Sequence, residues 1–113
     1  MNSRYHLVQM DTQTLQHIVE RIVKILKPQK IILFGSRAER RAQEESDVDL
    51  LVILDAPIDR RAQFKLTSQI SKEVALRIQL IPMVRATYEE TKDTIGGIAY
   101  PATKYGVVIY ENP

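Results

Sequence analysis

Apolar residues recur along the chain with two different periods, and these periods predict where helices and strands lie. In the N-terminal part they follow one another three or four residues apart, which is typical of an amphipathic helix. The apolar positions of this first helix are Leu15, Ile18, Val19, Ile22, Val23 and Leu26. Asp11 and Thr12 are suitable N-cap residues, and Pro28 predicts the end of the helix.

Four short runs of β-branched and other apolar residues predict strands, at 30–34, 48–54, 77–84 and 107–110. Between the second and third strand, apolar residues at four-residue spacing predict a helix that Pro57 opens. The expected order is helix, strand, strand, helix, strand, helix, strand. This order predicts an α/β (α+β) fold, a small mixed β-sheet with helices on one face. The length of the chain predicts a single domain over residues 1–113.

The last predicted helix and the turns around it are less regular. Thr87 and Glu90 fit a capping box for a short helix, and residues 98–105 predict one or two further helical turns. Gly106 is expected to cap these turns at their C-terminal end, because glycine is common at that position.

Composition excludes several classes of protein. The chain has no cysteine, so it has neither a disulfide framework nor a thiolate metal site, which fits the reducing cytoplasm. It contains no long apolar run and no N-terminal apolar stretch of signal-peptide length, so we expect neither a membrane span nor a secretory leader. The 16 basic and 14 acidic residues give a net charge of +2, which is too balanced to indicate nucleic-acid binding.

Two acidic residues stand at the entry of the second predicted strand. Asp47 and Asp49 are two residues apart, so their carboxylates point to the same face of the sheet while Val48 points to the other. Two like charges so close raise the free energy unless a cation lies between them, and Mg²⁺ binds carboxylate oxygens together with substrate phosphates. The pair predicts a metal site, although Asp-x-Asp alone is also compatible with a turn cap and a solvent-facing carboxylate.

A Gly-Ser pair follows the first predicted strand. Gly35 lets a ligand approach the backbone closely, and Ser36 offers a hydroxyl and an N–H group. If a short helix begins at Arg37, its first N–H groups face an anion. Taken alone, this pair is equally compatible with an ordinary turn. Both pairs lie at strand ends that a mixed sheet can place side by side, so together they predict phosphate donors facing metal ligands, as nucleotidyl transfer requires.

The sequence resembles the minimal nucleotidyltransferases of the DNA polymerase beta superfamily. Their signature is Gly-Ser, a ten-residue spacer, Asp-x-Asp and an apolar strand, which Gly35, Ser36, Asp47 and Asp49 match. The resemblance covers most of the chain, including the leading helix, the RIQLIPM strand and the closing GVVIYE. It implies a nucleotidyltransferase fold, Mg²⁺ as the metal cofactor and ATP as the nucleotide substrate.

The resemblance also implies a partner and a role for each site residue. Many such proteins are antitoxins that attach AMP to a tyrosine of a HEPN-family toxin, so a cytoplasmic complex with such a toxin is expected. By the same resemblance, Gly35, Ser36 and Arg37 would bind the nucleotide, and Asp47 and Asp49 would be catalytic and bind the metal.

Two positions depart from the family pattern. Arg40 stands where relatives often have glycine, so the loop geometry is expected to differ. The third strand carries Gln79 where full catalysts have a third carboxylate, and an amide oxygen can touch a metal but brings no charge and cannot act as a base. Asp55, Asp59 and Glu73 are conceivable substitutes, but all three lie outside that strand.

Three functions are compatible with this pattern. The first is an enzyme that transfers AMP to a hydroxyl of a partner protein with the help of Mg²⁺. The second, motivated by Gln79, is a catalytically degenerate antitoxin that neutralises its partner by binding alone. The third is direct nucleic-acid binding through Arg37, Arg40 and Arg41. It is disfavoured because two glutamates follow these arginines and no aromatic residues for base stacking are interleaved with them.

Overall fold

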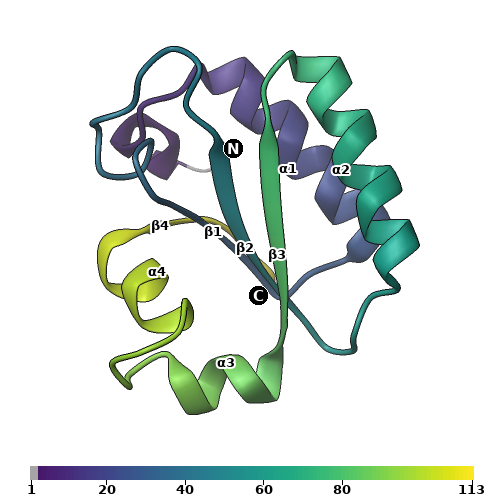
Figure 1. Ribbon diagram of the computed structural model, residues 1–113, viewed down its shortest axis with the longest axis vertical. Helices are drawn as coiled ribbons and strands as arrows, with labels where there is room; N and C mark the ends of the chain where they lie inside the picture. The colour runs from purple at the N-terminus through teal and green to yellow at the C-terminus, as the bar shows by residue number, and fades with distance from the viewer. Residues whose placement is uncertain (1–2) are drawn as a thin grey trace.

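A computed structural model describes residues 3–113 of the chain. Its four strands form one sheet in the order β3-β2-β1-β4 (Figure 1). The strands are β1 (Lys30–Phe34), β2 (Val48–Leu54), β3 (Ile78–Val84) and β4 (Val107–Glu111). β1 runs antiparallel to both of its neighbours, whereas β2 and β3 are parallel and are connected by α2 (Arg60–Val74). The sheet is therefore mixed, as the sequence predicts.

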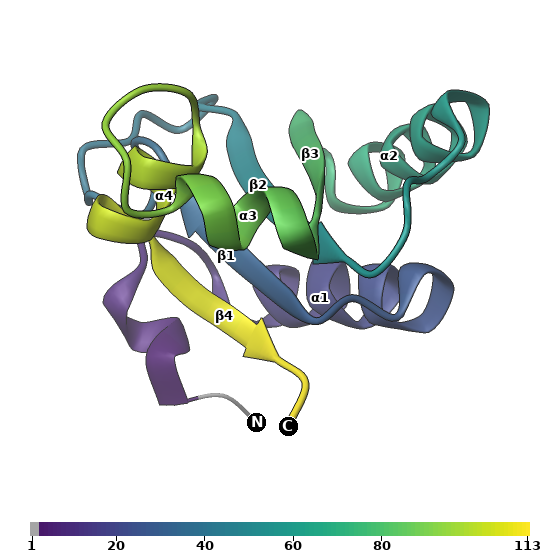
Figure 2. The same cartoon turned by 90° about the horizontal axis from the view of Figure 1, so that it is seen from below.

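Helices cover both faces of this sheet, and the prediction of helices on one face is wrong (Figure 2). The 3-10 helix η1 (Ser3–Leu7), α1 (Thr12–Leu26) and α2 lie on one face, and α3 (Arg85–Thr91) and α4 (Ala99–Tyr105) lie on the other. The reason is visible in β1 and β2, whose residues are apolar on both sides. Ile32, Leu51 and Ile53 point to the second face, where Tyr88 and Ala102 bury them.

The first two strands have the predicted bounds and the first helix lies where its apolar positions place it, but α2 starts later than expected. It begins at Arg60 rather than at Pro57 because Asp59 caps it: the Asp59 carboxylate accepts a hydrogen bond of 3.0 Å from the Ala62 N–H. A side-chain acceptor at the N-cap satisfies a donor that the helix leaves open, and a proline two residues earlier cannot do so. None of the helices that the structure describes is long and apolar enough to span a lipid bilayer.

The predicted capping box of the third helix is wrong. α3 begins at Arg85 and continues directly from β3, so Thr87 and Glu90 lie inside the helix. The N-cap residue is Val84, which forms no side-chain capping bond. This short helix therefore depends on tertiary packing, mainly through the buried Tyr88 ring, rather than on a local signal.

Gly106 caps α4 as predicted, but for a different physical reason. Its backbone is extended, with φ −87° and ψ 179°, so the left-handed conformation that favours glycine is not needed. A side chain there would instead collide with the neighbouring strand, because a Cβ would lie 2.8 Å from both the Ile32 side chain and the Leu33 carbonyl oxygen. Glycine lets α4 turn into β4 against the surface of β1.

Candidate functional site

The antiparallel pairing of β1 and β2 brings the Gly-Ser pair next to the Asp-x-Asp pair. Phe34, the last residue of β1, is paired with Asp49 near the start of β2, and Gly35 follows at once. Gly35 has φ +76°, and a Cβ at this position would collide with the Asp49 carboxylate. Only glycine adopts this conformation without strain and leaves the carboxylate its space. The predicted juxtaposition of the two pairs is therefore confirmed.

The two aspartates lie on the α3–α4 face at the start of β2. Val48 between them is fully buried on the opposite face. The pKa of Asp49 is raised above its usual value, chiefly because burial disfavours the charged carboxylate and further because the nearby Asp47 carboxylate repels it. A cation bound between the two carboxylates would offset both effects.

The side chains at this position fit one Mg²⁺ ion. Two carboxylates completed by water and nucleotide phosphates form a common Mg²⁺ site, and the missing side chain of Gly35 leaves Asp49 its place beside the backbone. A cluster of three or more acidic, His or Cys ligands for a metal is not found within residues 3–113. The site therefore offers two carboxylates, not three.

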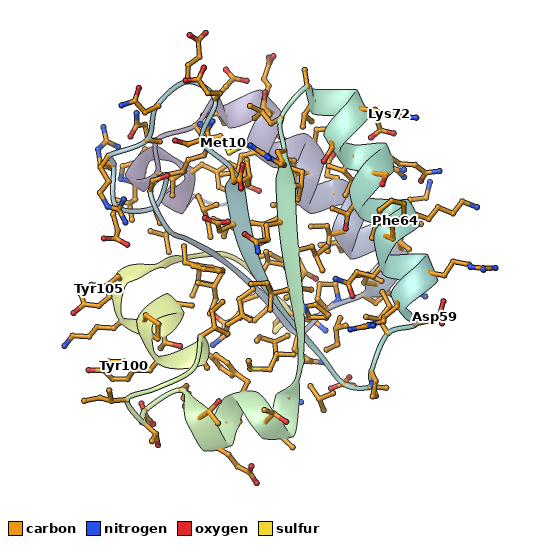
Figure 3. All side chains as sticks on the ribbon, in the orientation of Figure 1. Met10, Asp59, Phe64, Lys72, Tyr100 and Tyr105 are labelled. Carbon is orange, nitrogen blue, oxygen red and sulfur yellow. The ribbon has the colours of Figure 1, made fainter. Side chains whose placement is uncertain are left out.

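β3 carries an amide, Gln79, at the position where the family resemblance predicts a third carboxylate in full catalysts. The parallel pairing of β2 and β3 places Gln79 directly beside Asp49, with its side chain exposed. None of the three conceivable substitutes reaches this place. Asp55 follows the far end of β2, and Asp59 caps α2 (Figure 3). Glu73 binds His17 at 2.7 Å on the α1–α2 side of the sheet.

Residues 36–40 form a turn, so the short helix considered from Arg37 onward is not formed. The Gly35 carbonyl accepts hydrogen bonds from the N–H groups of Ala38 and Glu39, at 3.1 and 3.0 Å. The Ser36 hydroxyl and the N–H groups of Ser36 and Arg37 have no partner in the part of the chain that the structure describes. Successive open N–H groups in a turn can form a concave anion site, so donors suited to a phosphate are available here without a helix.

The Arg37 side chain lies inside the loop, so its backbone N–H is the part of this residue that remains open at the predicted nucleotide site. It is 7% exposed, and its guanidinium donates hydrogen bonds to three backbone carbonyls. These belong to Gln9 at 3.3 Å, Glu44 at 3.1 Å and Ser46 at 2.9 and 3.2 Å. The side chain therefore ties the two ends of the loop 35–47 together and links them to the N-terminal segment.

Gln9 makes the second tie to this loop, and no local sequence signal reveals it. Its side-chain amide donates to the Ala42 carbonyl at 2.9 Å and accepts from the Ala42 N–H at 2.8 Å. Arg40, between these ties, has φ +59°, the left-handed conformation in which glycine is strain-free. The loop thus keeps the backbone shape expected for a glycine at Arg40 even though the residue differs.

Arg77 is a further residue of the site that was not among the predicted ones. It immediately precedes β3, and its carbonyl accepts a hydrogen bond of 2.9 Å from the Val48 N–H. Its side-chain Nε lies 2.8 Å from the Asp47 carboxylate. The signal that would have revealed it is the register, since aligning Gln79 with Asp49 places Arg77 beside Asp47.

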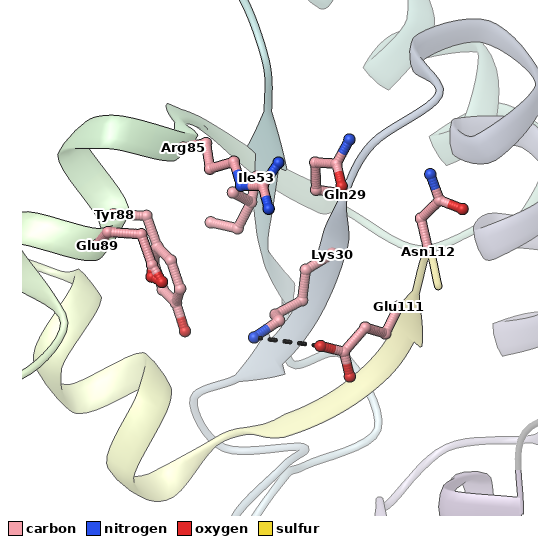
Figure 4. A pocket seen from close by; sticks show the side chains of 8 residues that line it. All are labelled: Gln29, Lys30, Ile53, Arg85, Tyr88, Glu89, Glu111 and Asn112. Atoms are coloured by element: carbon pink, nitrogen blue, oxygen red, sulfur yellow. Dashed lines mark ion pairs between the residues drawn. The ribbon is translucent and has the colours of Figure 1, made fainter.

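A polar cavity lies at the other end of the sheet (Figure 4). Lys30 at the start of β1 and Glu111 at the end of β4 line it, with 3.6 Å between their charged groups. The Lys30 ammonium also lies 5.4 Å from the centre of the Tyr88 ring. None of the predicted site residues lines this cavity, so it is separate from the Gly35–Asp49 junction.

Comparisons with known proteins agree with this geometry. Residues 15–113 match the family described as "Polymerase beta, Nucleotidyltransferase". No curated protein matches the chain.

Among solved structures, a toxin–antitoxin crystal structure with AMP-PNP aligns with a TM-score of 0.67 and 16% identity, over 91% of this chain and 75% of that one. The MntA–HepT toxin–antitoxin structure gives 0.64 and 16%, over 90% and 74%. A tri-AMPylated Shewanella oneidensis HEPN toxin in complex with its MNT antitoxin gives 0.62 and 18%, over 91% and 74%. These likenesses establish the fold, and the family match over most of the length establishes that the chain belongs to the polymerase beta nucleotidyltransferase family.

Proposed function

We propose that this protein is an antitoxin that transfers AMP from ATP to a hydroxyl group, expected to be a tyrosine, of a HEPN-family toxin in the cytoplasm. The observation that carries the proposal is the junction of Gly35 with Asp49. There the open donors of Ser36 and the carboxylates of Asp47 and Asp49 come from adjacent strand ends. Phosphate donors beside metal ligands are the groups that nucleotidyl transfer needs.

The similar solved structures support the substrate and the partner in this proposal. One is a toxin–antitoxin structure with AMP-PNP, an analogue of ATP, and another contains an AMPylated HEPN toxin bound to an MNT antitoxin. Both share the fold of this chain over about nine tenths of its length, 91% in each case. The chain also belongs to the nucleotidyltransferase family, so the site lies in a fold that is used for this type of transfer.

The residues of the chain would bind and orient the two reactants. The Ser36 hydroxyl and the N–H groups of the turn would hold the phosphate oxygens, and Asp47 and Asp49 would hold Mg²⁺. When bound, Mg²⁺ would neutralise phosphate charge and lower the pKa of the attacking hydroxyl. The tyrosine oxygen would attack the α-phosphorus, the bond to the bridging oxygen would break, and pyrophosphate would leave while the hydroxyl proton passes to solvent.

Intact mass spectrometry of the chain co-purified with a HEPN-family toxin tests this proposal. After incubation with ATP and Mg²⁺, we expect the toxin mass to rise by whole AMP units. Asp47→Asn or Asp49→Asn should slow this rise at least about 100-fold, because the metal loses a charged ligand. Asp55→Asn is the matched control, since it removes an exposed carboxylate at the far end of β2 and should leave the rate unchanged.

Neutralisation by binding alone is the second candidate, and the neutral Gln79 beside Asp49 favours it. It predicts no mass increase, together with a stable complex that inhibits the toxin. It also predicts that the Asp47→Asn and Asp49→Asn variants still neutralise the toxin. Loss of neutralisation in folded forms of these variants, in parallel with loss of AMP transfer, would exclude it.

A further inference from the structure

Arg77 holds a fixed place beside the predicted metal ligands. The bond from the Val48 N–H to its carbonyl continues the parallel pairing of β2 and β3 beyond the Val48–Ile78 pair. Its Cα is therefore held next to Asp47, and its Nε contacts the Asp47 carboxylate at 2.8 Å. A guanidinium has the geometry and the permanent charge that suit carboxylate and phosphate oxygens.

The Nε of the Arg77 side chain is paired with Asp47, and the rest of its guanidinium is exposed to solvent. Arg77 is 79% exposed, and Asp47 is its one ion-pair partner among the residues that the structure describes. The pair uses Nε, which leaves the two terminal amino groups of the guanidinium without an acceptor in residues 3–113. These groups can donate to a second anion while the residue stays beside Asp47.

The net charge of the site indicates a role for an arginine at this position. Asp47 and Asp49 carry two negative charges, so one bound Mg²⁺ brings their sum to zero and Arg77 raises it to +1. Three carboxylates with two Mg²⁺ ions also sum to +1. The neutral Gln79 removes one carboxylate and with it a ligand for a second ion, and Arg77, two residues earlier on the same strand edge, restores the same net charge toward the triphosphate.

We propose that Arg77 is a nucleotide-binding residue that contacts the phosphates of ATP and supplies the positive charge that a second metal ion supplies in a three-carboxylate site. The inference rests on the proposed nucleotide site and adds a residue to it. It makes the site one that works with a single Mg²⁺ ion and an arginine. Recognition of phosphate by the fork of an arginine is strong and directional.

Titration calorimetry with AMP-PNP and Mg²⁺ tests this role without relying on activity. We expect Arg77→Gln to weaken nucleotide binding about 10- to 100-fold, because a charge-assisted pair of hydrogen bonds is lost. Arg77→Lys keeps the charge but not the fork, so its nucleotide affinity should lie between that of the parent protein and that of Arg77→Gln. Because Arg77 is exposed, both variants should retain the thermal midpoint of the parent protein.

Arg85→Gln is the matched control. It removes the same charge from an exposed arginine at the far end of the sheet, where Arg85 lies 3.8 Å from Asp55, and it should leave the affinity unchanged. Equal or tighter nucleotide binding by Arg77→Gln would overturn the proposal, since tighter binding would mean that Arg77 merely competes with the metal for Asp47. An equal loss of affinity in Arg85→Gln would also overturn the proposal, because the loss in Arg77→Gln would then reflect the change in overall charge and not a contact with the nucleotide.

The same titration separates this inference from the proposed function. If the parent protein binds no nucleotide, both fail. If it binds nucleotide, transfers no AMP and loses affinity on Arg77→Gln, the transfer reaction fails and the role of Arg77 stands. If it transfers AMP and Arg77→Gln binds as tightly as the parent, the role of Arg77 fails and the proposed function stands.

Discussion

Gly35 is the residue on which the whole site geometry depends. Its φ of +76° disfavours any side chain, and the space of a Cβ is taken by the Asp49 carboxylate. We expect Gly35→Ala to lower the free energy of unfolding by about 1–2 kcal/mol for the left-handed conformation alone. Displacement of Asp49 should add to this, and Mg²⁺·AMP-PNP affinity should fall roughly tenfold or more. Urea unfolding and calorimetry measure the two effects.

Gly97→Ala provides the control for the backbone part of this effect. Gly97 has φ +63°, close to that of Gly35, but nothing lies within 4 Å of the position of its Cβ. It should therefore show the cost of the conformation without the collision, and its nucleotide affinity should stay that of the parent. If Gly35→Ala binds nucleotide as well as Gly97→Ala does, the close approach of Gly35 to Asp49 has no part in the site.

At the scale of single elements, the loop 35–47 depends on Arg37. Its guanidinium satisfies the carbonyls of Gln9, Glu44 and Ser46 in a buried place. Arg37→Met keeps much of the length and removes every donor, so these partly buried carbonyls lose their partners. We expect the free energy of unfolding to fall by about 2–4 kcal/mol, measured by urea unfolding. Hydrogen exchange of the loop amides should become faster.

Arg41→Met shows whether the effect of replacing Arg37 comes from its buried position or from the loss of a positive charge. Arg41 is exposed on the same loop, and Glu39, at 3.6 Å, is its one ion-pair partner among the described residues. The substitution should change stability by less than about 0.5 kcal/mol, as expected for a surface ion pair. Similar losses for the two variants would show that Arg37 acts through charge alone and does not hold the loop.

These elements also show which parts of the fold a sequence can predict. The strands at Lys30–Phe34 and Val48–Leu54 were predicted with their observed bounds, because β-branched runs between turn residues are local signals. The start of α2 was missed because Pro57 and Asp59 are both suitable at a helix start, and the choice depends on whether the Asp59 carboxylate reaches a free N–H of the first turn. The packing of α3 and α4 on the second face was missed because an apolar run does not show whether helices bury it on one face or on both.

The candidate site divides in the same way. One motif contains Gly35, Ser36, Asp47 and Asp49. The antiparallel pairing of β1 with β2 is therefore enough to bring these residues together. The roles of the two arginines depend on contacts between distant segments. Arg37 takes part of its acceptors from the segment at Gln9, and the contact of Arg77 with Asp47 depends on the register of β2 and β3 across α2.

Over the whole molecule, the two layers around the sheet are unequal. The cluster on the α1–α2 face contains far more buried side chains than the cluster on the α3–α4 face. α3 and α4 have seven residues each, a length at which an isolated helix is unstable in water. The aspartates of the candidate site lie on the side of this weaker layer, so local opening is expected there before the sheet unfolds.

Native-state hydrogen exchange tests this unequal stability. We expect the amides of α3 and α4 to exchange at a lower free energy of opening than those of β2, which is buried at the centre of the sheet. The hydroxyl of Tyr88 on α3 lies 3.1 Å from that of Thr103 on α4 and links the two helices. Tyr88→Phe should therefore lower the opening free energy of both helices by about 1 kcal/mol and leave β2 unchanged.

Tyr5→Phe makes the same chemical change in the stronger layer and should leave α3 and α4 unaffected, because Tyr5 packs in the cluster on the α1 face. If α3, α4 and β2 all exchange at one free energy, and Tyr88→Phe lowers it equally for all three, the layers unfold as one cooperative unit. The aspartates would then lie on a face as stable as the rest of the domain.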